Sequence, residues 1–363
     1  MKTKNILLTL TALIALILTF VNCSKDDDDN GGDKKSSSLI GGWICDDSGD
    51  YDKDYYIFEE DGTVLAIEIN YPDDPDPKVD IRLYDWKNSK GQLTCNRGAC
   101  KEVVNFFISS NGEKLSITDE DNDSETFTRL TDAELQAIRK KLNIDPDLVG
   151  FWQQEGTSTY VELDPDGYGT QLHNNFTSMK WKAKDGTVSF QTFGGATAKN
   201  KYTVADDKNS FMFGSLKYVR VAEDQYKDLF NDYVKKNDFL GAWENENPWA
   251  ADPTSSILSP AYRNNYIVFN SDGTFKVIAL KAKDSKGTTI TDIKKYDGKW
   301  QFDRSLFTFT IDNNESADAV PWQLTKESLR CGLPFIAPLV TYDKYWAYGK
   351  FVKIDMSYVE PYL

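Results

Sequence analysis

The sequence contains little of the chemistry on which most enzymes depend. Among 363 residues there is one histidine, His173, and only five cysteines. A Ser-His-Asp triad, or a zinc site with two histidines, is therefore excluded or reduced to this one position. No Gly-x-Ser-x-Gly, phosphate loop or dinucleotide-binding fingerprint occurs. The many acidic residues single out no catalytic pair, so we expect a protein that is not an enzyme and that has no cofactor and no metal site.

Long apolar runs are also missing, except at the start of the chain. An uncharged apolar stretch, residues 6–21, follows Lys2 and Lys4 and ends shortly before Cys23. It is short for a transmembrane helix, which needs about 20 residues. A basic start followed by an apolar run of this length is typical of a secretory signal.

The residues around Cys23 resemble the processing site of bacterial lipoproteins. Phe20-Val21-Asn22-Cys23 is similar to a lipobox, although Asn22 replaces the small residue usual there, and SKDDDDNGG resembles the surface-export signal of Bacteroidota lipoproteins. The resemblance implies a signal peptide over residues 1–22, acylation of Cys23 and an acidic disordered tether over residues 23–38. The expected location is the outer membrane, facing the cell exterior. The alternative is a cleaved secretory peptide followed by an ordinary acidic linker.

The charge of the mature chain restricts its partners. Removal of residues 1–22 takes away two of the 42 basic residues and leaves 40 against 57 acidic ones, a net charge of −17. This charge opposes binding to nucleic acid and to anionic lipid headgroups. We therefore expect a cationic or neutral partner, no nucleic acid, and attachment to the membrane through acyl chains.

Two cysteines lie close together in the first third of the chain. Cys95 and Cys100 flank Asn-Arg-Gly-Ala, which predicts a hairpin turn. Because an exported protein can keep disulfides, these two residues are candidates for a cross-hairpin bridge. The spacing is not Cys-x-x-Cys, which argues against a metal knuckle. The sequence leaves open whether Cys45 and Cys331 are free or paired.

One sequence pattern occurs three times along the chain. LIGGW (39–43), LVGFW (148–152) and FLGAW (239–243) are each followed by the same four features in the same order. These features are a Tyr-rich hairpin with an acidic-Gly turn, a second Trp, a later hairpin and a closing aromatic strand that ends on a basic residue. Five ordered markers in three copies indicate an internal repeat of one module.

The shortest copy shows what each module is. Residues 148–221 contain eight candidate strands with alternating apolar and polar side chains and a turn at roughly every eight to ten residues. Sequential antiparallel strands of this kind remove their exposed edges by closing into an up-and-down barrel. The prediction is an all-β chain of three small tandem antiparallel barrels over residues 39–130, 148–221 and 239–355.

Short helical patterns separate the copies. Residues 131–147 and 222–238 place apolar side chains at helical spacing, with acidic residues first and lysines last. Thr131 and Glu134 form a Thr-x-x-Glu capping box pattern. We therefore expect two short α-helical linkers, each with one apolar stripe against a neighbouring barrel.

The repeated markers resemble the lipocalins of the calycin superfamily, and more closely the lipocalin-like domains of Bacteroidota lipoproteins, over residues 39–355. In that family the Trp of Gly-x-Trp lies across the closed end of the barrel and a basic side chain stacks over its indole, a contact that contributes about 0.5–2 kcal/mol. The resemblance implies a structural role for three pairs: Trp43 with Arg129, Trp152 with Arg220, and Trp243 with Lys353.

Lipocalins commonly hold a small apolar ligand in the barrel mouth, so the resemblance implies a lipid-anchored binding protein. The third copy, with the longest strands and loops, is the expected place for such a ligand. The alternative is a structural or interaction protein, whose filled barrels contact a glycan or a protein through loops. Trp249, Trp346 and the aspartate-rich stretch over residues 51–56 are then the candidate contacts, unless each Trp covers its own barrel. A third, weaker hypothesis is that the protein inhibits an enzyme.

Overall fold

A computed structural model describes residues 39–49, 51–74, 77–89, 91–97, 100–119, 122–193, 195–246, 263–282, 289–303, 306–311, 317–320, 322–331 and 349–363. Cys23, the expected tether, Trp249 and Trp346 lie outside this part of the chain. The chain forms two compact units. The first comprises mainly the described residues between 39 and 142, and the second mainly the described residues between 143 and 363. Within the described ranges, no helix is long and apolar enough to cross a membrane.

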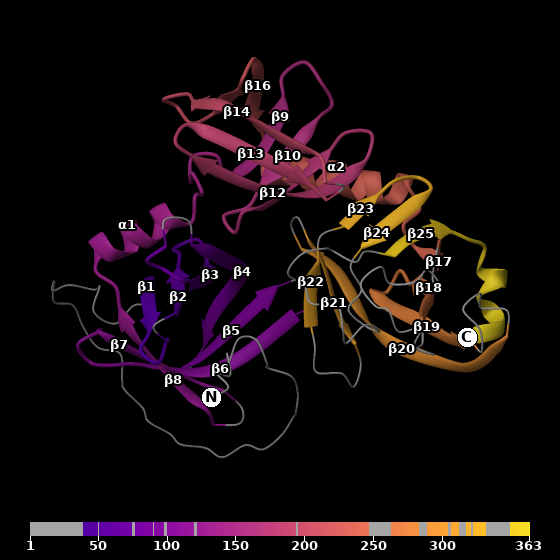
Figure 1. The fold of residues 1–363 in the computed structure, drawn as a ribbon, viewed down its shortest axis with the longest axis horizontal. Helices are drawn as coiled ribbons and strands as arrows, with labels where there is room; N and C mark the ends of the chain where they lie inside the picture. The colour runs from indigo at the N-terminus through magenta and orange to yellow at the C-terminus, as the bar shows by residue number, and fades with distance from the viewer. Residues whose placement is uncertain are drawn as a thin grey trace. The chain divides into compact units, whose positions relative to one another are not determined.

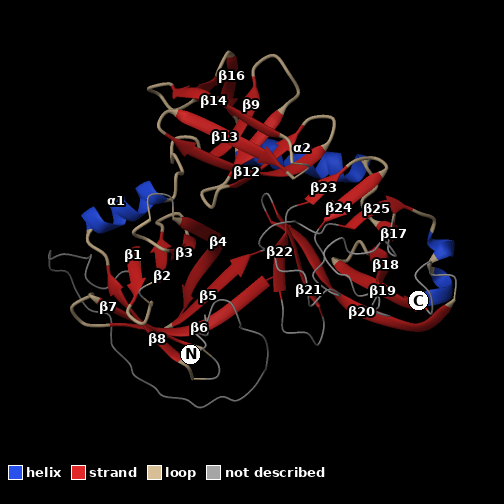
Figure 2. Ribbon diagram, viewed as in Figure 1, coloured by secondary structure: helices blue, strands red, loops and turns tan. Residues whose placement is uncertain are grey.

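The protein is all-β and contains closed eight-stranded antiparallel barrels (Figures 1 and 2). In the first unit eight strands follow one another around a ring, and β1 pairs with β8 to close it. These strands are β1 (Gly41–Cys45), β2 (Asp52–Phe58), β3 (Thr63–Asn70), β4 (Lys78–Ser89), β5 (Gln92–Arg97), β6 (Cys100–Ile108), β7 (Lys114–Thr118) and β8 (Ser124–Arg129).

A second ring of eight strands lies in the second unit. Each strand pairs with the next, and β16 returns to pair with β9. The strands are β9 (Gly150–Gln154), β10 (Tyr160–Leu163), β11 (Tyr168–Leu172), β12 (Phe176–Lys184), β13 (Thr187–Thr192), β14 (Thr197–Val204), β15 (Ser210–Phe213) and β16 (Leu216–Arg220).

The remaining strands belong to the same unit. β17 pairs with both β18 and β25, the pairing continues in order from β18 to β22, and β23 to β25 pair in order. Residue 321, between β22 and β23, lies outside the described part. The strands are β17 (Gly241–Asn245), β18 (Arg263–Phe269), β19 (Thr274–Ala282), β20 (Ile290–Asp303), β21 (Leu306–Ile311), β22 (Ala317–Val320), β23 (Trp322–Leu324), β24 (Ser328–Cys331) and β25 (Gly349–Lys353).

In each unit, an apolar segment that follows the last strand of a ring covers the outside of that ring. α1 (Asp132–Lys141) begins with the predicted capping box between Thr131 and Glu134. Its Arg139 forms an ion pair at 2.5 Å with Glu59, and the helix buries Ile138. A Cβ on Gly42 would lie 2.9 Å from side-chain carbons of both Leu130 and Leu135, so the helix packs closely against β1.

The second helix, α2 (Glu223–Lys236), contacts two sets of strands within its unit. On one side Tyr226 lies 5.1 Å from the ring of Phe151 and hydrogen-bonds to Thr170. On the other side Phe230 packs 5.9 Å from Trp322. β12 also pairs directly with β23. The helix is therefore part of a core that joins the β9–β16 ring to the strands that follow it.

The C-terminus covers the outside of β17–β20. Two short 3-10 helices, η3 (Met356–Tyr358) and η4 (Glu360–Tyr362), hold Val359 fully buried in a cluster with Val268 and Ile278. The ring of Tyr362 stacks on Tyr266 at 5.4 Å. The sequence prediction ended the third copy at residue 355, because three residues per turn with few apolar positions give no helical periodicity.

Candidate functional site

The structure brings each of the three Trp–base pairs together. The guanidinium carbon of Arg129 lies 4.1 Å from the ring centre of Trp43, and that of Arg220 lies 4.1 Å from Trp152. The Nζ of Lys353 lies 4.8 Å from the ring of Trp243. All three tryptophans are completely buried. Each of the three repeated segments thus carries an indole under a positive charge on its first strand.

The backbone of the first two residues of the repeated pentapeptide accepts hydrogen bonds from both members of each Trp–base pair. In every copy the Trp indole donates to the carbonyl of the residue four positions earlier, at 2.8–2.9 Å: Leu39, Leu148 and Phe239. The basic side chain donates to the carbonyl of the second letter: Ile40, Val149 and Leu240. The apolar side chain of the first residue is needed for a separate reason, because Leu39, Leu148 and Phe239 are each buried in a core.

The glycine is required for a different reason. Gly41, Gly150 and Gly241 have φ angles of +122°, +129° and +103°, a region that residues with a Cβ avoid. A Cβ on Gly150 would also lie 2.3 Å from the guanidinium of Arg220. Both the backbone turn and the room for the base therefore depend on glycine.

The third pair differs from the other two because its base is a lysine, Lys353. Burial lowers the pKa of the Lys353 ammonium, and the nearby carboxylate of Asp238, at 3.6 Å, opposes this. The single ammonium of Lys353 donates to the carbonyls of Asp238 and Leu240. The guanidinium of Arg220, by contrast, makes three hydrogen bonds through three different nitrogens. The ammonium lacks the planar face with which an arginine stacks on the ring.

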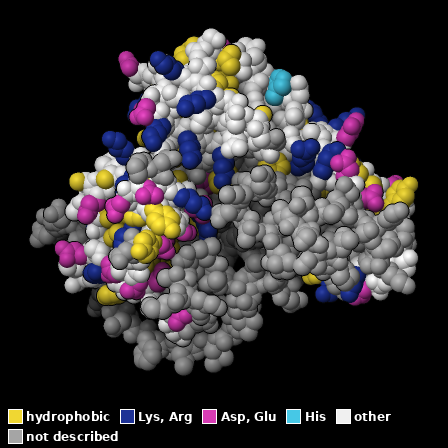
Figure 3. All heavy atoms as spheres, in the orientation of Figure 1, with side chains coloured by type: hydrophobic (Ala, Val, Ile, Leu, Met, Phe, Trp, Pro, Cys, Tyr) yellow, Lys and Arg dark blue, Asp and Glu magenta, His cyan; other side chains and the backbone are white. Residues whose placement is uncertain are grey.

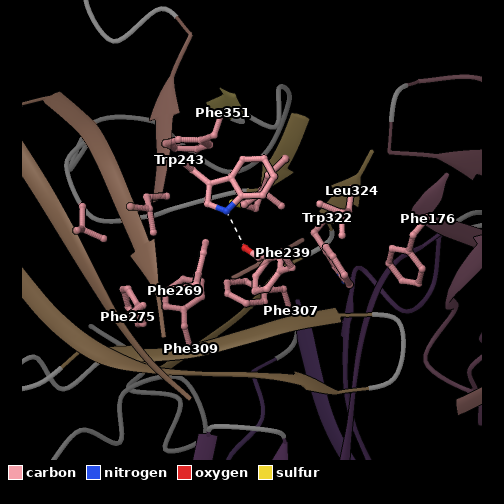
Figure 4. Close-up of a cluster of buried hydrophobic side chains, with 14 of the residues drawn as sticks. Phe176, Phe239, Trp243, Phe269, Phe275, Phe307, Phe309, Trp322, Leu324 and Phe351 are labelled. Atoms are coloured by element: carbon pink, nitrogen blue, oxygen red, sulfur yellow. Dashed lines mark hydrogen bonds between the residues drawn. The ribbon is translucent and has the colours of Figure 1, made fainter. Parts of the chain in front are cut away.

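Aromatic side chains fill the inside of the strands β17–β25. Trp322 lies 4.4 Å from Phe302 and 4.3 Å from Phe176 of β12, and Phe239 contacts five aromatic rings at 4.6–6.2 Å (Figure 4). Rings this close together occupy the space between the described parts of these strands. This packing argues against the expectation that the third copy holds the ligand.

The first barrel has a different inner face. Near the Trp43 end its inner residues are apolar, including Phe58, Val64 and Phe127. Side chains alternate along a strand, so Asp54 lies on the same face of β2 as Tyr56 and Phe58, toward the opposite end. The inner face thus changes from apolar to charged along the barrel axis.

Two carboxylates oppose each other at this charged end. Asp54 of β2 is the direct cross-strand partner of Glu68 of β3. Arg82 of β4 is the adjacent cation, but it forms an ion pair at 3.2 Å with Asp80. Among the described residues no cation lies within ion-pairing distance of Asp54. Burial, then repulsion from Glu68 and Asp52, raises the pKa of Asp54 from 3.8 to about 6.

The inner face of the first barrel also carries the thiol of Cys45 and the indole of Trp86. Burial raises the pKa of the Cys45 thiol, and the carboxylates of Glu125 and Asp54 add to the effect. The buried Nε1 of Trp86, like that of Trp322 in the second unit, has no acceptor among the described residues, whereas the corresponding Trp181 donates to the backbone carbonyl of Asp164 at 3.0 Å. Sequence reasoning missed this polar half, because alternating charged residues in a strand are read as its solvent face.

Other candidate chemistry is limited in the described ranges. No group of three His, Cys, Asp or Glu side chains there is placed to hold a metal ion. His173 is exposed, with its Nδ1 3.1 Å from the Thr159 hydroxyl. Cys45 and Cys331 are buried free thiols in different cores. The side chain of Cys100 lies outside the description, so the Cys95–Cys100 bridge stays a prediction.

We expect Gly150→Ala to destabilise the second unit by at least about 2 kcal/mol, through an unfavourable φ and a clash with Arg220. Gly186→Ala is the matched control, because Gly186 also has a positive φ but a Cβ there would meet nothing within 4 Å. Chemical denaturation measures both. Equal losses would mean that the contact with the base contributes nothing.

We expect Asp54→Asn to stabilise the first unit by about 1–2 kcal/mol at pH 8, after allowance for partial exposure. The folded pKa lies above the unfolded value, so the wild-type free energy of unfolding falls as the pH rises from 4 through 6. At pH 4 the two proteins should differ little. Denaturation at both pH values, with exposed Asp73→Asn as control, measures the effect. A gain of equal size at pH 4 would contradict it.

Comparison with known proteins does not assign a family. No family model matches the chain, and no curated protein matches it. Among solved structures the chain is similar to the DNA polymerase sliding clamp of Pseudomonas aeruginosa in three crystal structures, at 7–9% identity. The alignments cover 86% of this chain and 90–92% of the clamp, with a TM-score of 0.12. A score this low carries no argument about fold or function.

Proposed function

We propose that the chain is a lipid-anchored, non-enzymatic binding protein made of three tandem lipocalin-like barrels. The support for three modules is the repeated Trp–base pair: in each copy a base on the last strand lies over the Trp of Gly-x-Trp and donates to the carbonyl just before the glycine. β17 also pairs with β25, as β1 pairs with β8 and β9 with β16. α1 and α2 then connect successive barrels.

The first barrel is the proposed ligand site. The observation that carries this proposal is the inner face on which a charged half, with Asp54 opposite Glu68, follows an apolar half. Like charges placed opposite each other in a sheet are destabilising, and a bound cation would relieve the repulsion. We infer a small ligand with an apolar body and a cationic group such as an ammonium.

The second and third barrels then serve a structural or interaction role. Their interiors are occupied by their own side chains, including Trp181, Phe211 and Trp322. This filling supports the alternative expected from the sequence, contact with glycan or protein partners from the outer surface, for these two modules. Trp249 and Trp346 stay candidate contacts on the loops.

The ligand proposal is tested with three molecules that share one tail: octylamine, octanol and octanoate. Calorimetric titration of the full mature chain should show binding of octylamine and little binding of octanoate. Asp54→Asn and Glu68→Gln should each weaken octylamine binding about tenfold, near 1.4 kcal/mol. Glu60→Gln, an exposed residue of the β2–β3 turn, is the matched control. Equal affinity for amine and carboxylate would contradict the proposal.

The anchor is tested separately. Cys23→Ala removes the only sulfur that the lipobox-like sequence offers for acylation, so the protein should move from the membrane fraction to the soluble fraction of its own cells. Mass spectrometry of the wild type should show an acylated N-terminal cysteine. An unmodified N-terminus after residue 22 would instead support a secreted protein with an acidic linker.

A further inference from the structure

The outer face of the β9–β16 ring carries a group of lysines that the ligand site does not use. Along β12, Lys180, Lys182 and Lys184 are exposed while the residues between them are buried. On β14, Lys199 and Lys201 are exposed on the same side of the sheet. We call these five residues the lysine face. Figure 3 shows Lys and Arg side chains gathered over this part of the second unit.

The register fixes the spacing of the lysine face. Lys182 pairs with Ser189 of β13, which pairs with Lys199, and Lys201 pairs with Thr187 in the next row. Adjacent strands lie about 4.8 Å apart, and alternate residues on a strand about 7 Å apart. Two columns of lysines therefore stand roughly 10 Å apart on either side of an uncharged column of Thr187, Ser189 and Gln191.

The lysines of this face stand out against the charge of the chain. Residues 148–221 carry eight basic and seven acidic residues, in a chain with a net charge of −15. The other three bases are engaged elsewhere: Lys208 with Asp147 at 2.7 Å, Lys217 with Glu155 at 2.8 Å, and Arg220 over Trp152. Within the described ranges no carboxylate lies within ion-pairing distance of Lys182, Lys199 or Lys201.

Three of the seven carboxylates in residues 148–221 are buried away from the lysine face, and the exposed Asp206 and Asp207 lie in the turn after β14. Glu162 is buried where Thr170 and Tyr226 of α2 meet, and Asp164 and Asp166 are buried in the β10–β11 turn. Asp185, in the turn after Lys184, is the nearest in sequence and lies at one end of the columns. An anion along the columns therefore meets positive charge.

We propose that the lysine face binds an acidic polysaccharide, a glycan chain that carries carboxylate or sulfate groups. Charge complementarity selects an anion. The hydroxyl and amide side chains of the central column suit a hydroxyl-rich sugar chain lying between two rows of ammonium groups. A planar anionic membrane would also approach the acidic remainder of the surface, whereas a narrow chain meets only the lysines within a screening length of about 8 Å.

This site is independent of the first barrel, so its test does not depend on the octylamine result. The full mature chain is titrated at physiological salt with heparin, a sulfated glycan, and with polygalacturonate, a carboxylated one; dextran is the uncharged comparison. We expect binding of one or both acidic polymers that weakens steeply with added salt, and none of dextran.

The triple variant Lys182→Gln, Lys199→Gln and Lys201→Gln should lose at least about tenfold in affinity for the acidic polymer, with a flatter salt dependence. The matched control neutralises three exposed lysines of α2 in the same unit: Lys227→Gln, Lys235→Gln and Lys236→Gln. Circular dichroism checks the fold of both. Equal losses in the two variants, or no loss in the first, would overturn the proposal.

A third measurement separates a glycan from a lipid surface. Co-sedimentation with phosphatidylglycerol vesicles, using the protein without its acyl group, should show weak binding that the two triple variants change equally. Strong vesicle binding that only the Lys182, Lys199 and Lys201 variant loses, together with no binding of either polymer, would assign the lysine face to a membrane instead.

Discussion

The stacking of a cation over a buried indole is the interaction on which each barrel of this protein depends. In the second copy the Trp indole donates to the carbonyl of Leu148, and the base donates to the carbonyls of Val149 and Asp147. Removing water from the base strengthens its attraction to the ring. The requirement for glycine follows from the same contact, because Arg220 occupies the space of its missing side chain.

Much of this architecture could be predicted from the sequence because its signals are local or repeated. The capping box at Thr131 and the two helices occur close to their predicted bounds. The C-terminal cover was missed, since Val359 is one buried residue in a segment without helical periodicity. The shared core at Phe176 was missed too, because an apolar residue at the end of a strand does not reveal which partner it will meet.

The charged inner face shows a second limit of sequence reasoning. Alternation on β2 and β3 reveals two faces but not which one is inside, and in the first barrel both faces contain buried residues. Asp54 and Glu68 therefore looked like solvent-facing residues until the register placed them beside Tyr56. By contrast, the lysines of β12 are exposed and alternate with buried residues, as expected for a strand with one face in solvent. A charge excess confined to two strands, β12 and β14, cannot be seen in the total charge of the chain.

The core shared through α2 restricts which repeats can be lost or exchanged during evolution. The β9–β16 ring contributes Phe176 and Leu172 to the same cluster as Trp243 and Trp322, while the first barrel has a cluster drawn from its own strands. Deleting the last repeat would leave those apolar side chains and one face of α2 in water. Recombination between copies should thus be tolerated at residues 131–147 and selected against at residues 222–238. Relatives with fewer repeats should have lost the first one, and the last two should be inherited as a pair.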